Sequence, residues 1–405
     1  MLEIKVGSIL FEKNLFFSAL LIFLMNSCIE PFDTEFVGFE SVLVIEATIT
    51  NETKQQKVYL TRTFEFEVDN TTAVRNASVE VTDDTGSTFT FLESEPGIYV
   101  SVDTFSALPD RNYKLSISTQ DGKSYGSSEM QLTQATQLDN ITARRITNDD
   151  GIDGIAILAD SFDPTGSSVN YRYDYEETYK IIAPKWSAID LEGDPAGGCG
   201  LVKIRNVRDE QICYNTDFSN EIILTNTGDL AEDRVAEFVV RFINRDNYII
   251  SHRYSILVRQ YIQSNEAYIF YDNLNQFSQS ESLFSETQPG FLKGNITSDQ
   301  DENEKVLGFF DVSSISEKRI FFDYTDFYPN EPLPPYVDPC NNNSPPLVDA
   351  LGGCLLRPIF EDKSARYWAD NPTPGPQEGP FFIVNRVCGD CTLLGKTEIP
   401  SFWVE

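Results

Sequence analysis

The sequence predicts a mainly β protein made of tandem immunoglobulin-like or fibronectin-like β-sandwiches, with one amphipathic helix and a long Pro-rich, disulfide-stapled C-terminal region. Three observations predict this class. Short runs of β-branched and aromatic residues recur between turn residues along most of the chain. One segment, near 265–278, has helical periodicity instead. Most prolines and five of the seven cysteines lie in the last half of the chain.

Residues 41–135 are predicted to form the first sandwich, of the immunoglobulin-like type. In the run Tyr113–Ile117, apolar and polar residues alternate, which is the period of a strand with one buried face. Turn signals such as Asp83–Gly86 and Asp121–Gly122 recur at the spacing typical of a sandwich. The likeness to sandwich modules of this size concerns the fold and carries no function.

Residues 136–327 are predicted to form a second β-rich domain, whose strands again favour a sandwich. Within it, Ile182–Tyr214 carries Cys199 and Cys213 among Gly and Asp residues. We expect this stretch to be a loop insertion closed by a disulfide between those two cysteines.

One amphipathic helix is predicted near 265–278, after Ser264 as its N-cap. Its apolar positions follow the helical spacing i, i+3, i+4, i+7 and i+10: Ala267, Phe270, Tyr271, Leu274 and Phe277. Such a stripe could bind a partner, but most amphipathic helices cover their own core. Packing on the sandwich is therefore the favoured interpretation.

Residues 1–27 are predicted to be a lipoprotein signal peptide. Lys5 and Lys13 precede the apolar run Leu15–Met25, which is shorter than the roughly 20 residues that span a bilayer. A positively charged N-terminal region, a short apolar core and small residues at the cleavage site are typical of secretory signal peptides. The segment therefore predicts export, and membrane attachment must come from elsewhere.

Cys28 is the predicted attachment point. It follows Ser27 and the apolar pair Leu24–Met25, a pattern that resembles the lipobox of bacterial lipoproteins. Cys28 would then be the acylated, palmitate-carrying first residue of the mature chain, with 28–40 as a lipid-anchored tether. The alternative is a signal peptide that is cut elsewhere, with Cys28 incidental.

The other cysteines form an even set of six, which suits three disulfides in an oxidising compartment. Proximity in the sequence favours the pairs Cys199–Cys213, Cys340–Cys354 and Cys388–Cys391, although six cysteines allow fifteen connectivities. The Cys-x-x-Cys spacing of the last pair also occurs in redox and zinc sites. A structural disulfide is favoured there, because no helix is predicted to begin at the motif and no second pair of soft ligands is evident.

Composition argues against several classes of function. The chain has 405 residues, with 31 Lys+Arg, 63 Asp+Glu and a formal charge of -32. Such a polyanion repels nucleic-acid phosphates, so no nucleic-acid partner is expected. With His252 as the only histidine and no phosphate loop or nucleophile motif, we expect no enzyme activity, no cofactor and no metal. Asp299–Glu304 begins like a calcium loop, but Glu304 stands where glycine is needed.

Residues 328–405 are predicted to form the Pro-rich C-terminal region with its cysteine pairs. A long ordered coil of this kind usually needs cross-links and usually has a function. Three aromatic residues are candidates for contact with a ligand or partner: Trp186, Tyr367 and Trp368. Each is more often a core residue than a surface one, so core packing is the competing interpretation.

Several segments resemble the Bacteroidetes outer-membrane lipoproteins of domain-of-unknown-function family 4249. They are Ser27–Phe32, Val258–Tyr271, Pro289–Ile296, Val306–Phe310, Cys388–Thr392 and Pro400–Trp403. The resemblance runs over nearly the whole mature chain. It implies a lipoprotein often encoded beside a TonB-dependent receptor and displayed on the outer-membrane surface, and it implies no catalytic residue.

The sequence thus favours a non-catalytic cell-surface lipoprotein that docks on an outer-membrane complex. A TonB-dependent barrel is the expected partner, serving nutrient uptake or the assembly and export of surface proteins. The expected location is the outer membrane, lipid-anchored and facing the cell exterior. The alternative is a stand-alone lipoprotein or adhesin that binds glycans or peptides through exposed aromatic residues.

Overall fold

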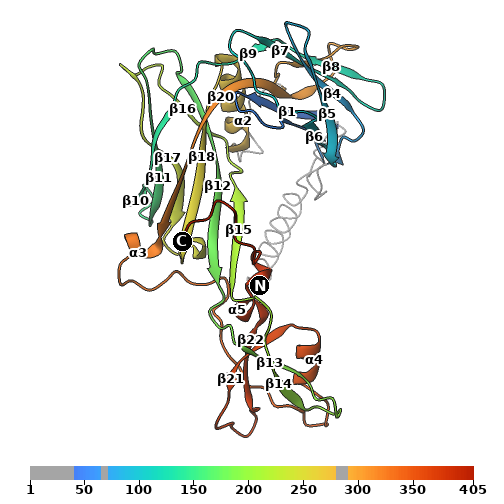
Figure 1. Ribbon diagram of the computed structural model, residues 1–405, viewed down its shortest axis with the longest axis vertical. Helices are drawn as coiled ribbons and strands as arrows, with labels where there is room; N and C mark the ends of the chain where they lie inside the picture. Colours follow the sequence, from blue (N-terminus) through green and yellow to red (C-terminus); the bar gives the residue numbers. More distant parts are fainter. Residues whose placement is uncertain (1–40, 65–71, 280–290) are drawn as a thin grey trace, which may run out of the picture. The chain divides into compact units, whose positions relative to one another are not determined.

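The computed structural model describes residues 41–64, 72–279 and 291–405, and Figure 1 shows their arrangement into strands and short helices. The predicted signal peptide, Cys28 and the tether lie outside these residues. The protein is mainly β with several sheets, as the sequence predicts. No helix in the three described ranges is both long enough and apolar enough to cross a bilayer.

The first sandwich contains the predicted strands of the N-terminal region. They are β1 (Leu43–Thr50), β2 (Lys57–Arg62), β3 (Thr72–Ala73), β4 (Ser78–Asp83), β5 (Thr88–Glu95), β6 (Ile98–Ser101), β7 (Asn112–Ser118), β8 (Ser124–Ser127) and β9 (Met130–Gln131). On β7, Tyr113, Leu115 and Ile117 are buried and their neighbours are not, which confirms the predicted alternation. These side chains join one apolar core.

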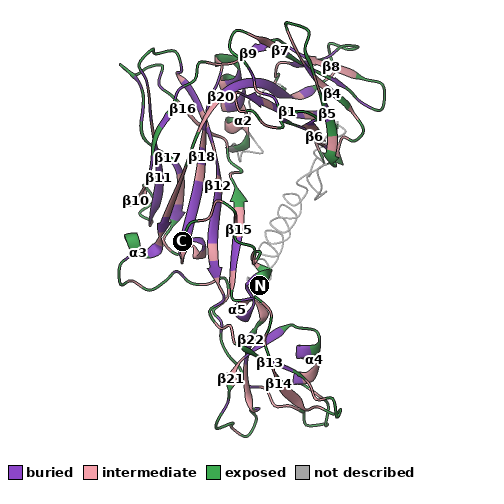
Figure 2. Cartoon of the chain, in the orientation of Figure 1, coloured by how far each residue is buried: buried purple, intermediate pink, exposed green. Residues whose placement is uncertain are grey.

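The second sandwich packs a three-stranded sheet against a larger one. The small sheet contains β10 (Leu138–Thr147), β11 (Asp153–Asp163) and β17 (Asp233–Asn244). The facing strands are β12 (Asn170–Ile182), β15 (Ile212–Phe218), β16 (Ile223–Asn226), β18 (Arg253–Ile262) and part of β20 (Val306–Asp323), with η1 (Tyr248–Ile250) before β18. Side chains from both sheets share one core, and Figure 2 shows β12 buried or intermediate along its length.

Strand β20 belongs to both sandwiches. Its first part, Val306–Ser313, pairs in parallel with β1, and its second part, Ser314–Asp323, pairs antiparallel with β18. The short strand β19 (Ile296–Ser298) adds to β8. Residues 296–313, which the sequence places in the second domain, therefore complete the first sandwich. A pairing between strands more than 250 residues apart leaves no trace in local periodicity, which is why the predicted boundary missed it.

The predicted helix is present as α2 (Asn265–Gln279). The hydroxyl of Ser264 accepts a hydrogen bond from the backbone N–H of Ala267 at 3.1 Å, as expected of an N-cap. Ala267, Phe270 and Tyr271 are buried in the core of the first sandwich. The apolar stripe therefore packs on the protein's own core and is not a free partner-binding face.

The predicted loop insertion at 182–214 is instead a hairpin that packs on the C-terminal region. The hairpin is β13 (Ile189–Gly193) and β14 (Leu201–Arg205). Its strand β13 contacts α4 (Leu356–Glu361) and β21 (Ala365–Asp370), and β21 pairs with β22 (Phe381–Asn385). Leu191 shares a small core with Leu356 and Ile383. We call residues 189–205 and 338–393, which include α5 (Arg386–Gly389) and η2 (Cys391–Leu393), the stapled module. The helix α3 (Tyr324–Phe327) precedes it.

Candidate functional site

The six cysteines form three disulfides, but none of the predicted pairs. The bonds are Cys199–Cys354, Cys213–Cys391 and Cys340–Cys388. The predictions Cys199–Cys213, Cys340–Cys354 and Cys388–Cys391 were wrong because they used distance along the chain. The hairpin β13–β14 folds against the C-terminal region, so cysteines far apart in sequence become neighbours. The two cysteines of the Cys-x-x-Cys motif are not bonded to each other. Cys388 is bonded to Cys340, and Cys391 is bonded to Cys213.

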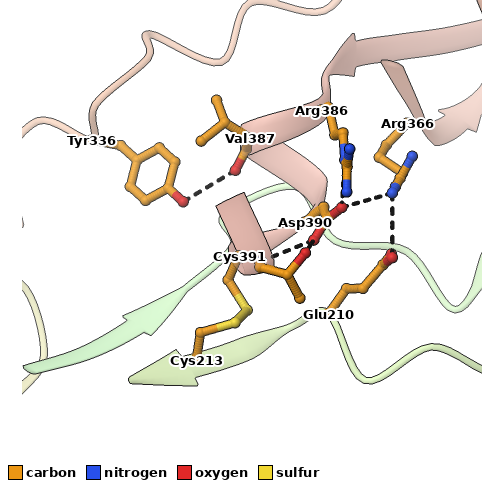
Figure 3. Close-up of a disulfide and its surroundings, with 9 residues drawn as sticks. Glu210, Cys213, Tyr336, Arg366, Arg386, Val387, Asp390 and Cys391 are labelled. Atoms are coloured by element: carbon orange, nitrogen blue, oxygen red, sulfur yellow. Dashed lines mark hydrogen bonds and ion pairs between the residues drawn. A yellow bond between two sulfur atoms is a disulfide. The ribbon is translucent and has the colours of Figure 1, made fainter. Parts of the chain in front are cut away.

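A buried ionic cluster lies beside Cys213–Cys391, and Figure 3 shows Arg366 and Arg386 both directed at Asp390. Arg366 donates to the Asp390 carboxylate at 2.7 Å and to Glu210 at 3.2 Å, and Arg386 donates to Asp390 at 2.7 Å. Burial raises the pKa of the Asp390 carboxyl, but hydrogen bonds from Thr392 and Arg386 outweigh it and lower the pKa overall. The cluster joins Glu210, which lies just before β15, to β21 and to the end of α5, and all of its carboxylates are paired with arginines, which indicates a structural role.

The three candidate aromatics do not form an exposed platform. Tyr367 is buried in the core of the stapled module, and its hydroxyl donates to Asp370 at 3.0 Å. Trp186 packs against the core of the second sandwich. The Trp368 ring has the ammonium of Lys185 4.0 Å from its centroid. The structure therefore supports the core interpretation for Tyr367 and Trp186, and it shows no shared binding surface for the three.

The turn before α4 presents apolar side chains to solvent. The side chain of Leu351 is 96% exposed, and those of Val348 and Leu355 are also exposed. The Asp349 carboxylate accepts from the backbone N–H groups of Leu351 and Gly353, both at 2.8 Å. The neighbouring Cys354 is bonded to Cys199. We call Val348–Leu355 the Leu351 turn.

A second feature, which the sequence reasoning missed, is a groove formed by two adjoining cavities of about 410 and 420 Å³. We call it the Arg172 groove, and both cavities are lined by Glu46, Arg172, Asp174, Phe218 and Arg259. The groove results from the alternation of side chains between the two faces of each strand. Arg172 and Asp174 lie on the face of β12 opposite to the buried tyrosines, and Arg172 is directly paired with Tyr261 of β18.

Arg172 is held by aromatic rings. Its guanidinium carbon lies 4.3 Å from the ring centroid of Tyr261 and 5.0 Å from that of Tyr271 in α2. Its Nε atom is buried and has no hydrogen-bond partner. Burial lowers the pKa of Arg172, but Tyr271, Tyr261 and Asp174 outweigh it and raise the pKa overall. The guanidinium therefore stays charged.

The other arginine of the groove is already neutralised. Arg259 lies 3.1 Å from an oxygen of Asp174, 3.4 Å from Glu176 and 3.4 Å from Glu317. By contrast, no ion pair joins Arg172 or the exposed Lys57 to a carboxylate within 41–64, 72–279 and 291–405. A sequence signal for the site did exist in Tyr171–Tyr175, where a strand with one aromatic face carries an arginine on its other face.

Two further sequence candidates have ordinary explanations. Glu304 of the acidic turn accepts hydrogen bonds from Lys123 at 2.7 Å and from the Tyr125 hydroxyl at 3.0 Å. Asp338, Cys340 and Cys388 have ligand atoms close enough to hold a metal ion. Because the two cysteines are bonded to each other, they offer no thiolate to such an ion.

The sequence matches the family described as Domain of unknown function (DUF4249) over residues 29–319. The chain belongs to this family. No curated protein matches it. Among solved structures, a DUF4785 family protein from Legionella pneumophila is 9% identical, with a TM-score of 0.17 over 53% of this chain and 50% of the other. The B domain of a biofilm associated protein is 8% identical, with a TM-score of 0.13 over 68% of this chain and 85% of the other.

Scores this low carry no argument about fold or function, and this chain spans only half the length of the Legionella protein. The extent of the DUF4249 match is more informative. It includes every residue that lines the Arg172 groove but ends before the cysteines at 340, 354, 388 and 391. Two disulfides, Cys199–Cys354 and Cys213–Cys391, therefore connect the DUF4249 region to the C-terminal residues beyond it.

Proposed function

We propose that this DUF4249 protein is a non-catalytic bacterial surface lipoprotein that docks on an outer-membrane complex through its stapled module. In this proposal Cys28 carries the acyl chains, and the partner is a TonB-dependent receptor that serves nutrient uptake or the assembly and export of surface proteins. The Bacteroidetes origin and the exterior location belong to the same proposal. They come from the resemblance of the N-terminal segment and of the family segments.

The observation that carries the docking proposal is the Leu351 turn. A leucine that is 96% exposed gains nothing for folding, yet the chain holds it in a fixed place. The turn is closed by hydrogen bonds to the Asp349 carboxylate and anchored by Cys199–Cys354. A preorganised apolar side chain loses little entropy when a partner covers it, which is a property of residues that dominate binding interfaces.

Charge and chemistry fit a docking role better than catalysis. The one histidine, His252, is half-buried, and burial and the neighbouring Lys180 lower its pKa, so it stays neutral at physiological pH. The buried carboxylates Asp390 and Glu210 are paired with arginines. These groups stabilise the module and leave its exposed turn as the feature that needs a partner.

The test is affinity purification of the tagged lipoprotein in mild detergent from the native cells. We expect a barrel to co-elute with the wild type and to be lost with Leu351→Asp. The matched control is Leu230→Asp, because Leu230 is also an exposed loop leucine and lies outside the module. The Cys199→Ala/Cys354→Ala variant should retain less barrel, since its turn is no longer anchored.

Anchoring is tested separately by fractionation of Cys28→Ala cells. We expect the variant in the soluble fraction and the wild type in the membrane fraction, where acyl chains hold it. An unmodified Cys28 in wild-type membranes would refute the lipoprotein proposal. Equal recovery of the barrel with Leu351→Asp, or no barrel with the wild type, would refute the docking proposal.

A further inference from the structure

We propose that the Arg172 groove binds an acidic saccharide, with Arg172 and Lys57 contacting the carboxylate of a uronic-acid unit. This site is separate from the Leu351 turn and does not depend on docking. The argument concerns three properties of the groove: its charge, the kind of side chains that line it, and the strands that form its walls.

The larger cavity of the groove is richer in cations than in carboxylates, although Glu221 gives the adjoining cavity one carboxylate more than its two arginines. The chain carries a formal charge of -32, yet the cavity of about 420 Å³ is lined by four cations and two carboxylates. The cations are Lys54, Lys57, Arg172 and Arg259, and the carboxylates are Glu46 and Asp174. Lys54 is paired with Glu52, and Arg259 is paired as described above. No direct ion pair joins Lys57 or Arg172 to a carboxylate within the described residues, although Asp174 and Asp311 act on Arg172 from farther away, so an incoming anion would be the first direct ionic partner of either cation.

Buried polar atoms in the groove also need partners. Thr50 is 2% exposed and lines this cavity, and its hydroxyl has no hydrogen-bond partner. The buried Nε atom of Arg172 likewise has no hydrogen-bond partner. Because buried polar groups are normally hydrogen-bonded, these two atoms make the lining of the groove more polar than its hydrogen bonds satisfy.

The lining favours a hydroxyl-rich ligand. Of the thirteen residues that line this cavity, ten have charged, amide or hydroxyl side chains and three are aromatic, with no aliphatic residue among them. Most sites for small organic ligands are predominantly apolar, whereas this one offers many donors and acceptors. Two of the aromatic rings, Tyr59 and Phe218, are exposed at its rim and could pack against the apolar face of a sugar ring. Cavities of this size lie in the range that holds small ligands.

The walls disfavour an extended peptide. Peptides often bind by adding a strand to a free sheet edge, which gives them main-chain hydrogen bonds. At the groove, β1 is already paired with β2 and β20, and β12 is paired with β15, β16 and β18. These two strands, β1 and β12, therefore offer no unpaired edge to an acidic peptide.

The test is calorimetric titration of the full-length, detergent-purified lipoprotein with tetragalacturonate. We expect saturable binding that weakens with salt, no binding of the neutral sugar maltotetraose, and at least a tenfold loss of affinity in Arg172→Gln and in Lys57→Gln. Lys114→Gln is the matched control, because Lys114 is an exposed lysine on β7 that lines neither cavity. Phe218→Ser should also weaken binding without unfolding the protein, since Phe218 is 66% exposed.

Three results would overturn the proposal. The first is no heat of binding with tetragalacturonate at millimolar concentration. The second is equal affinity for maltotetraose, which would remove the role of the carboxylate. The third is tighter binding of a tetraglutamate peptide, which would identify the groove as a peptide site. If Arg172→Gln fails to fold by circular dichroism, Lys57→Gln and Phe218→Ser decide the outcome, and unchanged affinity in both would refute the site.

Discussion

Replacing both Cys213 and Cys391 by alanine is expected to lower the free energy of unfolding substantially. The bond joins residues 178 positions apart. A cross-link mainly restricts the unfolded chain, and the chain-entropy relation gives about 5 kcal/mol for a loop of that order, while measured values are usually about 2–4 kcal/mol. Cys340–Cys388 closes a separation of 48, for which the same relation gives about 4 kcal/mol. The first bond should therefore contribute about 1 kcal/mol more than the second.

Urea unfolding of the two alanine double variants measures this difference, with the wild type as reference. The overlap of the three loops lowers both values, but the order should hold because the longer loop restricts more of the chain. A loss below about 1 kcal/mol for the Cys213–Cys391 variant would contradict the reasoning, since the bond would then restrict very little.

The connectivity itself has a direct assay in a tryptic digest without reductant. The bonds predict one covalent assembly of four peptides: 186–203, 209–234, 320–363 and 387–396. Pairing of sequence neighbours would link only 186–203 with 209–234 and leave the other two peptides separate. The mass of the assembly distinguishes the two outcomes, and separate peptides would refute the disulfides that define the stapled module.

Three further predictions concern single residues. Burial raises the pKa of the Asp163 carboxyl, but hydrogen bonds from its own turn outweigh it and lower the pKa to about 2, so its stabilisation is present above pH ~4 and is lost as the pH falls toward 2. Asp163→Asn should therefore lower the free energy of unfolding by about 2 kcal/mol at pH 7. The urea midpoint of the variant should depend less on pH between about 4 and 2 than that of the wild type. Arg366→Met should cost about 3–5 kcal/mol in urea unfolding, because it removes a partner from the buried Asp390; a change below 1 kcal/mol would mean that the cluster contributes little. Gly308→Ala should lower the melting temperature sharply, because φ is 145° and a Cβ would lie 2.0 Å from a carbonyl oxygen of β1, whereas Gly86→Ala, with positive φ but open space, should cost much less.

Much of the local structure could be predicted from the sequence, because it depends on neighbouring residues. The alternation of Tyr113, Leu115 and Ile117 correctly placed β7, and the spacing of Ala267, Phe270 and Tyr271 correctly placed α2 and its buried face. The N-cap at Ser264 was also correct. Periodicity and capping act over a few residues, so the pattern of the chain was enough for these elements.

Tertiary structure decided which distant segments meet. Local pattern could not show that β20 pairs with β1, that β13 packs on β21 and α4, or that the cysteines bond across those contacts. The Arg172 groove has the same origin, because its walls come from strands and a helix that are separate in the chain. The sequence alone determined the strand and helix periods and the even set of cysteines. Long-range strand pairing, which depends on the shape of the whole core, determined which of those residues became neighbours.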